Sequence, residues 1–392
     1  MRKLVCPYCY HEVSLSALHF QCHGRGSAAG NGCRKRVDEN RRQLTGYALE
    51  SWPTFPAPGR GKAGTCPECG AVSRIRACPT CHTTLPTTFG EDPRSPLVGL
   101  IGGKGAGKTV FLTVLMHELQ HAIRRRFGAD TRLIGDQHAG EASTKRWFET
   151  YERALFVDKV LPETTRSAID GVRAPIVFEW RTSRRRFARR PRPLSSTLSF
   201  YDAAGEDMTT QDSVYTQHYL RWTSALIVVL DPWQLPGARG RITVPDNAIR
   251  ENEPPQEVLN RVTEALRQRT NSGLIPVPMA VVFAKMDSFF DSLGPAHPLM
   301  RPPAAGPAYD ERAGAATHDH VLDLLGELGA DAIDSHLRLN YRKYRYFAVS
   351  ALGATPDYAS NSVNARGIQP HRVDEPLLWL LSLSGIVGRT RK

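Results

Sequence analysis

The chain has 392 residues, of which 41% are hydrophobic and 23% charged, and its formal net charge is +12. This is the composition of a soluble globular protein of two or three domains, and it excludes a disordered or collagen-like chain. No uninterrupted apolar stretch is long enough to span a bilayer, and the N-terminus lacks the apolar core of a signal peptide. We therefore expect a cytoplasmic protein.

All eight cysteines lie within the first 81 residues. Three Cys-x-x-Cys pairs and two single cysteines make up the set, which is Cys6, Cys9, Cys22, Cys33, Cys66, Cys69, Cys78 and Cys81. A Cys-x-x-Cys turn places two thiolates on one side of a tight knuckle, at the spacing that a tetrahedral Zn²⁺ ion accepts. The pattern predicts two closed four-cysteine zinc sites in residues 1–85, paired either sequentially or in an interleaved order.

Disulfides and redox-active pairs are the alternatives for these cysteines. A cytoplasmic location disfavours disulfides, and the repeated spacing without a preceding thioredoxin-like strand disfavours redox pairs. His11, His19 and His23 are substitute ligands should a single cysteine not bind. A Pro/Gly-rich linker over 51–64 separates the two halves of the region, and residues 86–95 form a second short linker.

Residues 102–109 match the complete phosphate-loop pattern G-x-x-x-x-G-K-[ST]. Backbone N–H groups of such a loop surround nucleotide phosphates, its lysine reaches the outer phosphates, and its hydroxyl ligates Mg²⁺. A short apolar run at 96–101 and a helix-like segment at 110–119 flank the loop, which disfavours a chance match. The predicted nucleotide-binding residues here are Gly102, Gly103, Lys104, Gly105, Ala106, Gly107, Lys108, Thr109 and Val110. Lys108 is the predicted catalytic cation, and Thr109 is a predicted magnesium ligand.

Strand-like and helix-like segments alternate after the loop, as is typical of a parallel α/β sheet. We expect a polar, helical stretch over 125–160 and a surface excursion over 295–316. The expected strands are 174–180, 196–201, 224–230, 278–283 and 344–349, and the expected helices are 254–269, 318–339 and 375–387. The predicted fold is therefore α/β: a P-loop NTPase three-layer αβα sandwich with a mostly parallel sheet over 96–392, preceded by a small zinc-ribbon region.

An arginine-rich run from Arg181 to Arg192 lies between the two strands of an expected long hairpin. Such a run can bind the phosphates of a nucleic acid or an acidic partner. A solvated loop is the favoured interpretation, because only Phe187 interleaves the arginines.

Two further segments have the residues that a magnesium-dependent switch needs. Asp202 and Gly205 form an Asp-x-x-Gly pattern at the end of a strand. The Asp202 carboxylate would hold Mg²⁺ through water, and the Gly205 N–H would meet the γ-phosphate and sense its loss. Upstream, Thr164 or Thr165 would supply another magnesium ligand, and the sequence does not decide between them.

The segment 281–287 resembles the guanine-reading Asn-Lys-x-Asp segment. A carboxylate at Asp287 accepts from guanine N1–H and N2–H₂, donors that adenine does not supply, and Lys285 packs its stem over the base. Ala284 stands where Asn or Thr is usual, so a side chain that braces the loop is missing. A later Ser-Ala-Leu segment resembles the Ser-Ala-Lys segment whose backbone N–H reads guanine O6; it consists of Ser350, Ala351 and Leu352.

The order of these segments, at the C-terminal ends of successive strands, resembles the translation-factor-related (TRAFAC) class of P-loop GTPases over roughly residues 95 to 390. The N-terminal zinc region and the long switch-region excursion resemble bacterial double-GTPase families of conflict and defence systems. The resemblance implies GTP or GDP, Mg²⁺ and two Zn²⁺ ions as ligands. It also implies slow hydrolysis of GTP to GDP and phosphate, a nucleotide-dependent switch, and a protein effector or regulator that docks on the zinc region.

Two residues bear on hydrolysis. Glu206 stands where a water-orienting Gln sits in Ras-like proteins, and it either orients the attacking water or is idle. Lys104 replaces a glycine; it leans toward the γ-phosphate, blocks an arginine finger from a partner, or points to solvent. The competing functions are a P-loop ATPase and a nucleic-acid-binding zinc protein with a regulatory nucleotide site. The position of Lys104 and the presence of Asp287 disfavour the first, and the intact Lys108-Thr109 pair disfavours the second.

Overall fold

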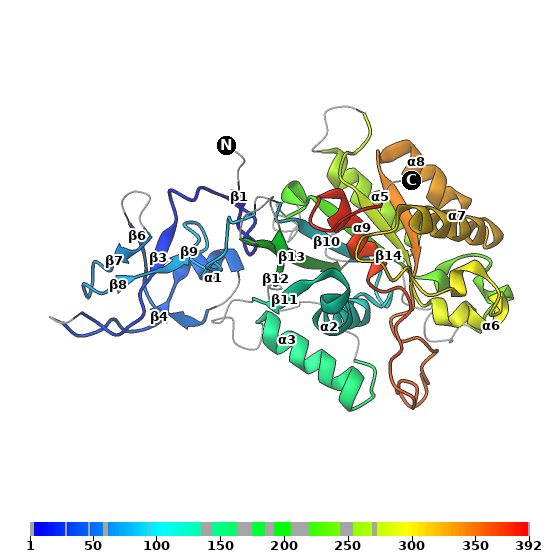
Figure 1. Cartoon of the computed structure of the whole chain (residues 1–392), viewed down its shortest axis with the longest axis horizontal. Helices are drawn as coiled ribbons and strands as arrows, with labels where there is room; N and C mark the ends of the chain where they lie inside the picture. Colours follow the sequence, from blue (N-terminus) through cyan, green and yellow to red (C-terminus); the bar gives the residue numbers. More distant parts are fainter. Residues whose placement is uncertain are drawn as a thin grey trace. The chain divides into compact units, whose positions relative to one another are not determined.

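The computed structural model describes residues 4–27, 30–45, 48–57, 62–92, 94–134, 143–162, 175–184, 192–204, 219–243, 254–268 and 273–390 (Figure 1). The description excludes the side chains of residues 45, 183–184, 192–193 and 202–204. The chain packs into two compact units. Unit 1 comprises Met1–Pro96, Asp130–Trp147 and Ala168–Tyr201, and unit 2 comprises Leu97–Ala129, Phe148–Ser167 and Asp202–Lys392. The predicted domain boundaries at residues 85 and 95 stay predictions.

A seven-stranded sheet is the largest element of this α/β fold, with the strand order β11-β12-β13-β10-β14-β15-β16. The strands are β10 (Leu97–Gly102), β11 (Ala129–Leu133), β12 (Ile176–Arg184), β13 (Arg192–Ala204), β14 (Ala225–Leu230), β15 (Met279–Phe283) and β16 (Tyr344–Ala348). Strands β10, β14, β15 and β16 run parallel, and Val281 lies between Val228 of β14 and Tyr346 of β16. Strands β12 and β13 form the expected antiparallel hairpin.

Unbroken apolar runs explain the central strands. Every residue of β10, β14 and β15 is buried, as parallel strands covered on both faces require. The parallel pairing of β10, β14, β15 and β16 confirms the predicted mostly parallel sheet. The prediction was possible because the apolar runs are short, continuous and separated by helical segments.

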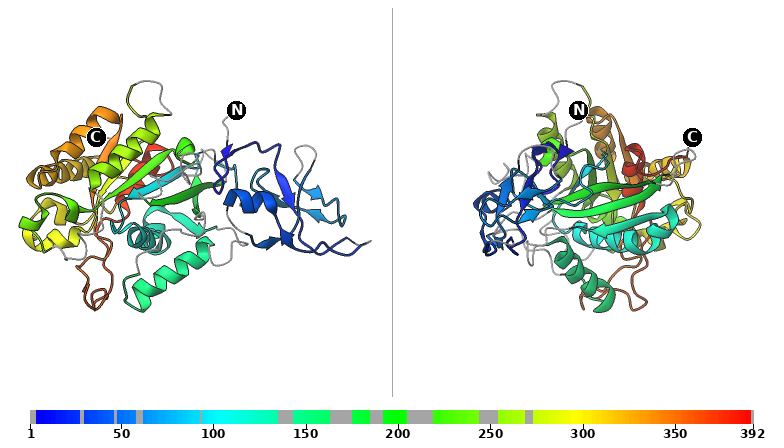
Figure 2. Two further views of the ribbon diagram at one scale, coloured as in Figure 1. Left: turned by 180° about the vertical axis from the view of Figure 1, so that it is seen from behind. Right: turned by 60° about the vertical axis from the view of Figure 1, so that its left-hand side comes forward.

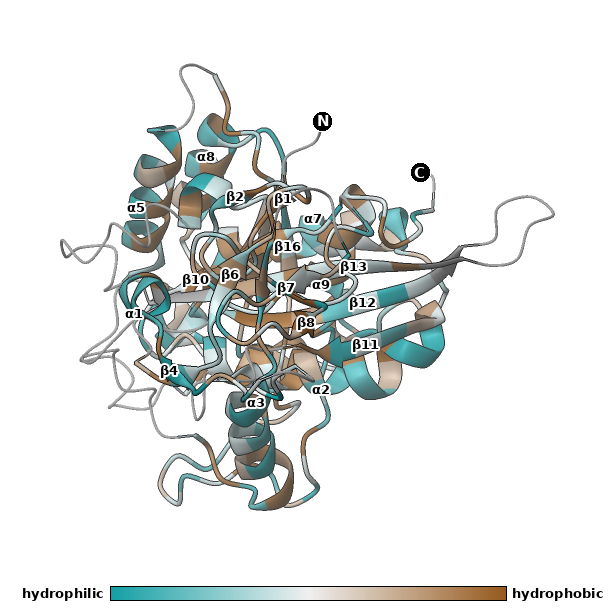
Figure 3. Cartoon of the chain, turned by 90° about the vertical axis from the view of Figure 1, so that its left-hand side faces the viewer, coloured by the Kyte–Doolittle hydropathy of each residue, from teal (hydrophilic) through white to brown (hydrophobic). Residues whose placement is uncertain are grey.

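Helices pack along the strands of unit 2 (Figure 2). They are α2 (Lys108–Phe127), α5 (Pro255–Arg267), α6 (Phe290–Leu293), α7 (Glu311–Glu327), α8 (Asp331–Asn340) and α9 (Glu375–Leu383). Helix α2 packs on β10, α7 on β16 and α9 on β15, while α5 and α8 lie side by side. Hydrophobic and hydrophilic residues alternate along α5 and α8, as in amphipathic helices (Figure 3). Within the described ranges, no helix combines the length and the apolar character needed to cross a bilayer.

Two expected elements were wrong. The helix expected over 318–339 is two helices, because Gly329 adopts a left-handed φ of 66° between α7 and α8. Helix α7 also begins earlier, at Glu311, because the Asp310 carboxylate accepts a hydrogen bond from the Ala313 N–H and caps it. The stretch 125–160 is only partly helical in its described residues. Helix α2 ends at Phe127 with Gly128 as its C-cap, strand β11 follows, and helix α3 (Thr144–Glu152) continues into a π-helical turn at Arg153–Val157.

The N-terminal region of unit 1 consists of very short elements. They are β1 (Leu4–Val5), β2 (Glu12–Val13), β3 (His19–Gln21), β4 (Arg36–Val37), α1 (Glu39–Thr45), β5 (Glu50–Ser51), β6 (Thr54–Pro56), β7 (Gly64–Thr65), β8 (Val72–Ser73) and β9 (Ile75–Ala77). Strands β6, β3 and β9 form a three-stranded sheet, and the others pair two by two. Cysteines lie in both apolar clusters of this region, so bound metal would supply the stability that so small a core lacks.

Candidate nucleotide site and four-cysteine clusters

The phosphate loop joins the end of β10 to the first turn of α2. Gly105 and Gly107 adopt left-handed φ values of 70° and 88°, which glycine reaches without strain. Gly102 has no room for a side chain, because a Cβ there would lie 2.7 Å from the carbonyl oxygen of Val229. The glycines thus let the loop turn sharply onto the N-terminus of a 20-residue helix, where backbone N–H groups favour an anion.

The Lys108 ammonium lies within this loop. It donates hydrogen bonds to the carbonyl oxygens of Gly102 at 2.8 Å and Gly103 at 2.9 Å, and the residue is 9% exposed. Ala106 is buried beside it, and Thr109 and Val110 are half-buried in the first turn of α2. Lys104 is exposed in the loop, and its predicted role in hydrolysis stays a prediction.

A second loop follows β15 and contains the predicted base-reading residues. Asp287 accepts a hydrogen bond of 2.5 Å from the hydroxyl of Ser350, which follows the neighbouring parallel strand β16 and is fully buried. The Ser350 oxygen in turn accepts from the Gly353 N–H at 2.8 Å. The structure therefore brings together the two segments that the sequence assigned to one site, and Ala351 and Leu352 lie half-buried next to them.

Burial raises the pKa of the Asp287 carboxyl, while the Ser350 hydroxyl, the Lys285 ammonium and the Thr355 hydroxyl act in the opposite direction. A carboxylate in this position is short of hydrogen-bond donors relative to one in water. Two N–H donors from a ligand would stabilise its charged form, which is the chemistry that a guanine edge supplies.

Lys285 adopts a left-handed φ of 49° and turns its ammonium toward the end of β14. The ammonium lies 2.9 Å from Asp231 Oδ2 and 3.6 Å from the centre of the Trp233 ring. Asp231 and Trp233 were not predicted as site residues. The signal for them is their position directly after the buried strand 225–230, next to the strand that carries Lys285.

Several predicted residues lie outside the described part of the chain. These are Thr164, Thr165, Gly205 and Glu206, together with the arginine run over 185–191. Asp202 lies in β13, but its side chain is not described. The two ends of the arginine run lie on the paired strands β12 and β13, where Arg184 is opposite Arg192 in the register. The Arg181 Nε lies 3.8 Å from the Glu179 Oε2.

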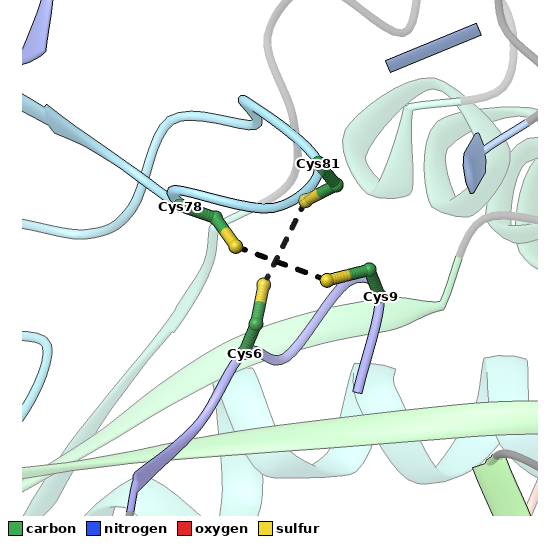
Figure 4. A group of neighbouring side chains, drawn as sticks. All are labelled: Cys6, Cys9, Cys78 and Cys81. Carbon is green, nitrogen blue, oxygen red and sulfur yellow. Dashed lines mark hydrogen bonds between the residues drawn. The ribbon is translucent and has the colours of Figure 1, made fainter. Parts of the chain in front are cut away.

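The eight cysteines form two groups of four with a nested pairing. The first group joins the first and last knuckles, Cys6, Cys9, Cys78 and Cys81 (Figure 4), and the second joins Cys22, Cys33, Cys66 and Cys69. The sequential pairing is therefore excluded. Two of the three nearby histidines have other partners: His11 hydrogen-bonds the Cys9 carbonyl, and His23 hydrogen-bonds the Val72 carbonyl. The ring centre of His19 lies 5.5 Å from that of His82.

The sulfur positions fit zinc. Four sulfurs held tetrahedrally at about 2.3 Å from Zn²⁺ lie about 3.8 Å apart. In the first group the Cys6–Cys81 and Cys9–Cys78 sulfurs are 3.9 and 3.8 Å apart. In the second group the Cys22–Cys69 and Cys33–Cys66 distances are 3.6 and 3.7 Å.

The pKa values of the thiols in the first cysteine group also favour a bound metal cation. Burial raises the pKa of the Cys6 thiol well above its ordinary value, while hydrogen bonds from the other cysteines lower the pKa of Cys78. Four sulfurs this close therefore share protons unless a metal ion replaces them.

The first cysteine group packs on the hairpin of unit 1. Val177 of β12 belongs to the same buried cluster as its four cysteines. The Ser199 hydroxyl of β13 donates to the carbonyl oxygen of Pro7, inside the first knuckle, at 2.8 Å, and lies 3.2 Å from the Tyr10 hydroxyl. This four-cysteine group thus contacts the strand that leads to Asp202.

Comparison with known proteins gives two findings and one absence. No protein-family model matches the chain. The chain is 26% identical over 336 residues to the "Putative ESX-1 scaffolding and assembly protein SaeC" of Mycolicibacterium smegmatis, over 80% of this chain and 81% of that protein. The GTP-bound GTPase-like domain of S. cerevisiae Ski7 aligns with 74% of this chain at 13% identity and a TM-score of 0.28. The chain spans 51% of that Ski7 chain, and a TM-score this low does not establish a shared fold.

Proposed function

We propose that the chain is a P-loop GTP-binding protein that hydrolyses GTP slowly and acts as a nucleotide-dependent switch. The observation that carries the proposal is the placement of three segments at the carboxyl ends of parallel strands of one sheet. The phosphate loop follows β10, the Lys285–Asp287 segment follows β15, and Ser350 follows β16. A triphosphate at the first and a guanine at the other two would occupy one edge of the sheet.

The strand order supports the same location. From β10 the chain crosses to β11 at one edge of the sheet, and it later enters β14 on the opposite side of β10. Open α/β sheets bind ligands beyond the carboxyl ends of the strands where the order reverses in this way. The three-layer P-loop sandwich and the TRAFAC class belong to the proposal on this basis.

The proposed switch needs Mg²⁺ and a residue that acts on water. Thr109 and Asp202 would hold the ion together with Thr164 or Thr165, and Gly205 would contact the γ-phosphate. Lys108 would neutralise charge on the phosphates, and Glu206 and Lys104 are the candidates for tuning the rate. The cytoplasmic location and the kinship with conflict-system families stay predictions.

Protein partners are part of the proposal. The relative SaeC is described as a scaffolding and assembly protein, which favours a protein partner over a nucleic acid. The two four-cysteine groups would provide a rigid zinc-stabilised docking module for it.

Calorimetric titration with GTP, GDP and ATP in the presence of Mg²⁺ tests the nucleotide. We expect guanine nucleotides to bind at least about tenfold more tightly than ATP, and Lys108→Ala to lose triphosphate binding. Tighter binding of ATP than of GTP would refute the proposal. Salt-dependent binding of RNA or DNA without nucleotide preference would instead support the nucleic-acid alternative.

A further inference from the structure

The base-reading loop lacks its usual internal brace. Ala284 is 7% exposed, and its methyl group can donate and accept no hydrogen bond. Its backbone N–H donates to the Leu230 carbonyl at 3.2 Å, and the Met286 N–H donates to the Val349 carbonyl at 3.1 Å. Main-chain bonds thus attach the loop to both neighbouring strands, but they do not orient the Lys285 side chain.

Two side chains at the end of β14 hold Lys285 instead. Asp231 is 4% exposed and accepts a hydrogen bond from the ammonium at 2.9 Å. The Trp233 ring lies under the same ammonium at 3.6 Å, within the range of a strong cation–π contact. Because both partners are buried, water competes little for the ammonium.

The two partners are themselves fixed. The Asp231 carboxylate accepts from the Trp233 backbone N–H at 3.1 Å, and the Trp233 indole N–H donates to the Ser288 hydroxyl at 3.1 Å. The ring of Tyr358 packs edge-on against Trp233, with 5.3 Å between ring centres. The ends of β14 and β15 and the segment after β16 therefore meet around one lysine side chain.

We propose that Asp231 and Trp233 are positioning residues for the nucleobase and replace the brace missing at Ala284, an inference that rests on the proposed GTP binding. By fixing the ammonium, they hold the lysine stem as a platform for the base and hold the left-handed backbone at Lys285. That backbone sets where Asp287, two residues later, presents its carboxylate. Recognition of a planar base needs such groups within about 0.5 Å of the productive geometry.

The test compares guanine with adenine nucleotides, because a displaced Asp287 carboxylate affects guanine, which supplies its N–H donors, more than adenine, which does not. In Asp231→Asn and in Trp233→Leu we expect the affinity for GTP to fall about tenfold more than the affinity for ATP, so that the preference for GTP falls by that factor. Trp233→Phe, which keeps an aromatic face under the ammonium, should retain most of the preference. Asp291→Asn, an exposed acid on α6, is the matched control and should behave as the wild type.

Each outcome of these titrations decides the proposal. Equal weakening of GTP and ATP binding would indicate a merely structural role and overturn it, as would an unchanged preference in Trp233→Leu. If Asp231→Asn does not fold, the Trp233→Leu and Trp233→Phe pair decides. A wild type without guanine preference refutes the proposed function itself, whereas a wild-type preference that survives both variants refutes only the role of Asp231 and Trp233.

Discussion

In the proposed site, nucleotide choice would depend on Asp287. Its side chain is half-buried, this partial burial raises the pKa of its carboxyl, and the Ser350 hydroxyl is one of its hydrogen-bond donors. An acceptor in such a place discriminates strongly, because a base without matching donors leaves it unsatisfied at a cost of about 1–3 kcal/mol. The charge on Lys285 nearby favours the ionised form that guanine needs.

Replacing Asp287 by Asn should change which base is preferred. The carboxamide presents an N–H₂ donor where the carboxylate presented an acceptor, and xanthine has a carbonyl where guanine has its 2-amino group. We expect GTP affinity to fall about tenfold or more, and xanthosine triphosphate to bind more tightly than GTP. Competition titrations with the two nucleotides measure this. A variant that still prefers GTP would show that Asp287 does not contact the base.

Single residues could be predicted from the sequence where a motif fixes their spacing. Asp287 and Ser350 belong to two such motifs, which follow neighbouring parallel strands, so we could expect their side chains to lie close together. Asp231 and Trp233 have no such pattern, and their role depends on the side-chain direction of Lys285. The nested cysteine pairing was equally hidden, because Cys-x-x-Cys spacing identifies a knuckle but not its partner.

At the scale of helices and strands, the elements that are fully buried are the ones that could be predicted from the sequence. Strands β10, β14 and β15 are continuous apolar runs and were predicted to within one or two residues. Strand β11 was missed because Ala129–Leu133 is largely polar, with only its first residue buried. The break at Gly329 was missed because apolar residues continue on both sides of it, so the helical pattern has no visible interruption.

If both cysteine groups bind zinc, the two ions should contribute unequally to stability. The first group lies in the cluster that contains Val177 of the hairpin, whereas the second packs with the small cluster around Phe20 and Phe55. We expect the wild type to bind two Zn²⁺ ions per chain, and each of the variants Cys78→Ser and Cys33→Ser to bind one. Cys78→Ser should lower the melting temperature more, because its cysteine is fully buried while Cys33 is half-buried.

Metal analysis combined with thermal unfolding checks this pair of variants. Cys33→Ser serves as the control, since it removes one ligand and one ion without touching the hairpin cluster. Equal melting temperatures in the two variants would contradict a special role of the first group in unit 1. A wild type with no bound zinc after purification without chelator would contradict both sites.

At the scale of the whole molecule, the pKa values of Glu311 and Glu375, both in the described part of the chain, shift in opposite directions. Burial alone would raise the pKa of Glu311, but hydrogen bonds from Arg345 and Arg389 outweigh it and lower the pKa to about 2. Burial raises the pKa of Glu375 to about 7, despite the guanidinium of Arg372 nearby. Both ordinary values are 4.5, so each shift links folding to proton binding.

The signs follow from where the folded protein binds protons. Glu311 stabilises the fold above pH 4.5, and this contribution is lost as pH falls toward 2. Glu375 keeps its proton in the folded state up to about pH 7, while the unfolded chain releases it near 4.5, so its contribution is lost as pH rises through that window. The two residues thus act in separate ranges, and single variants resolve them.

We therefore expect Glu311→Gln and Glu375→Gln to shift the unfolding free energy in opposite senses at pH 8. Glu311→Gln should lose about 3 kcal/mol there, because it leaves two guanidinium groups without their buried partner, and its deficit should shrink toward pH 2. The stability of Glu375→Gln should be less sensitive to pH between 4.5 and 7, so it should gain about 3 kcal/mol relative to the wild type across that window. Urea unfolding at a series of pH values measures both. Parallel pH profiles for the wild type and Glu375→Gln would show that this carboxyl is ionised in the folded protein, with Arg372 offsetting its burial.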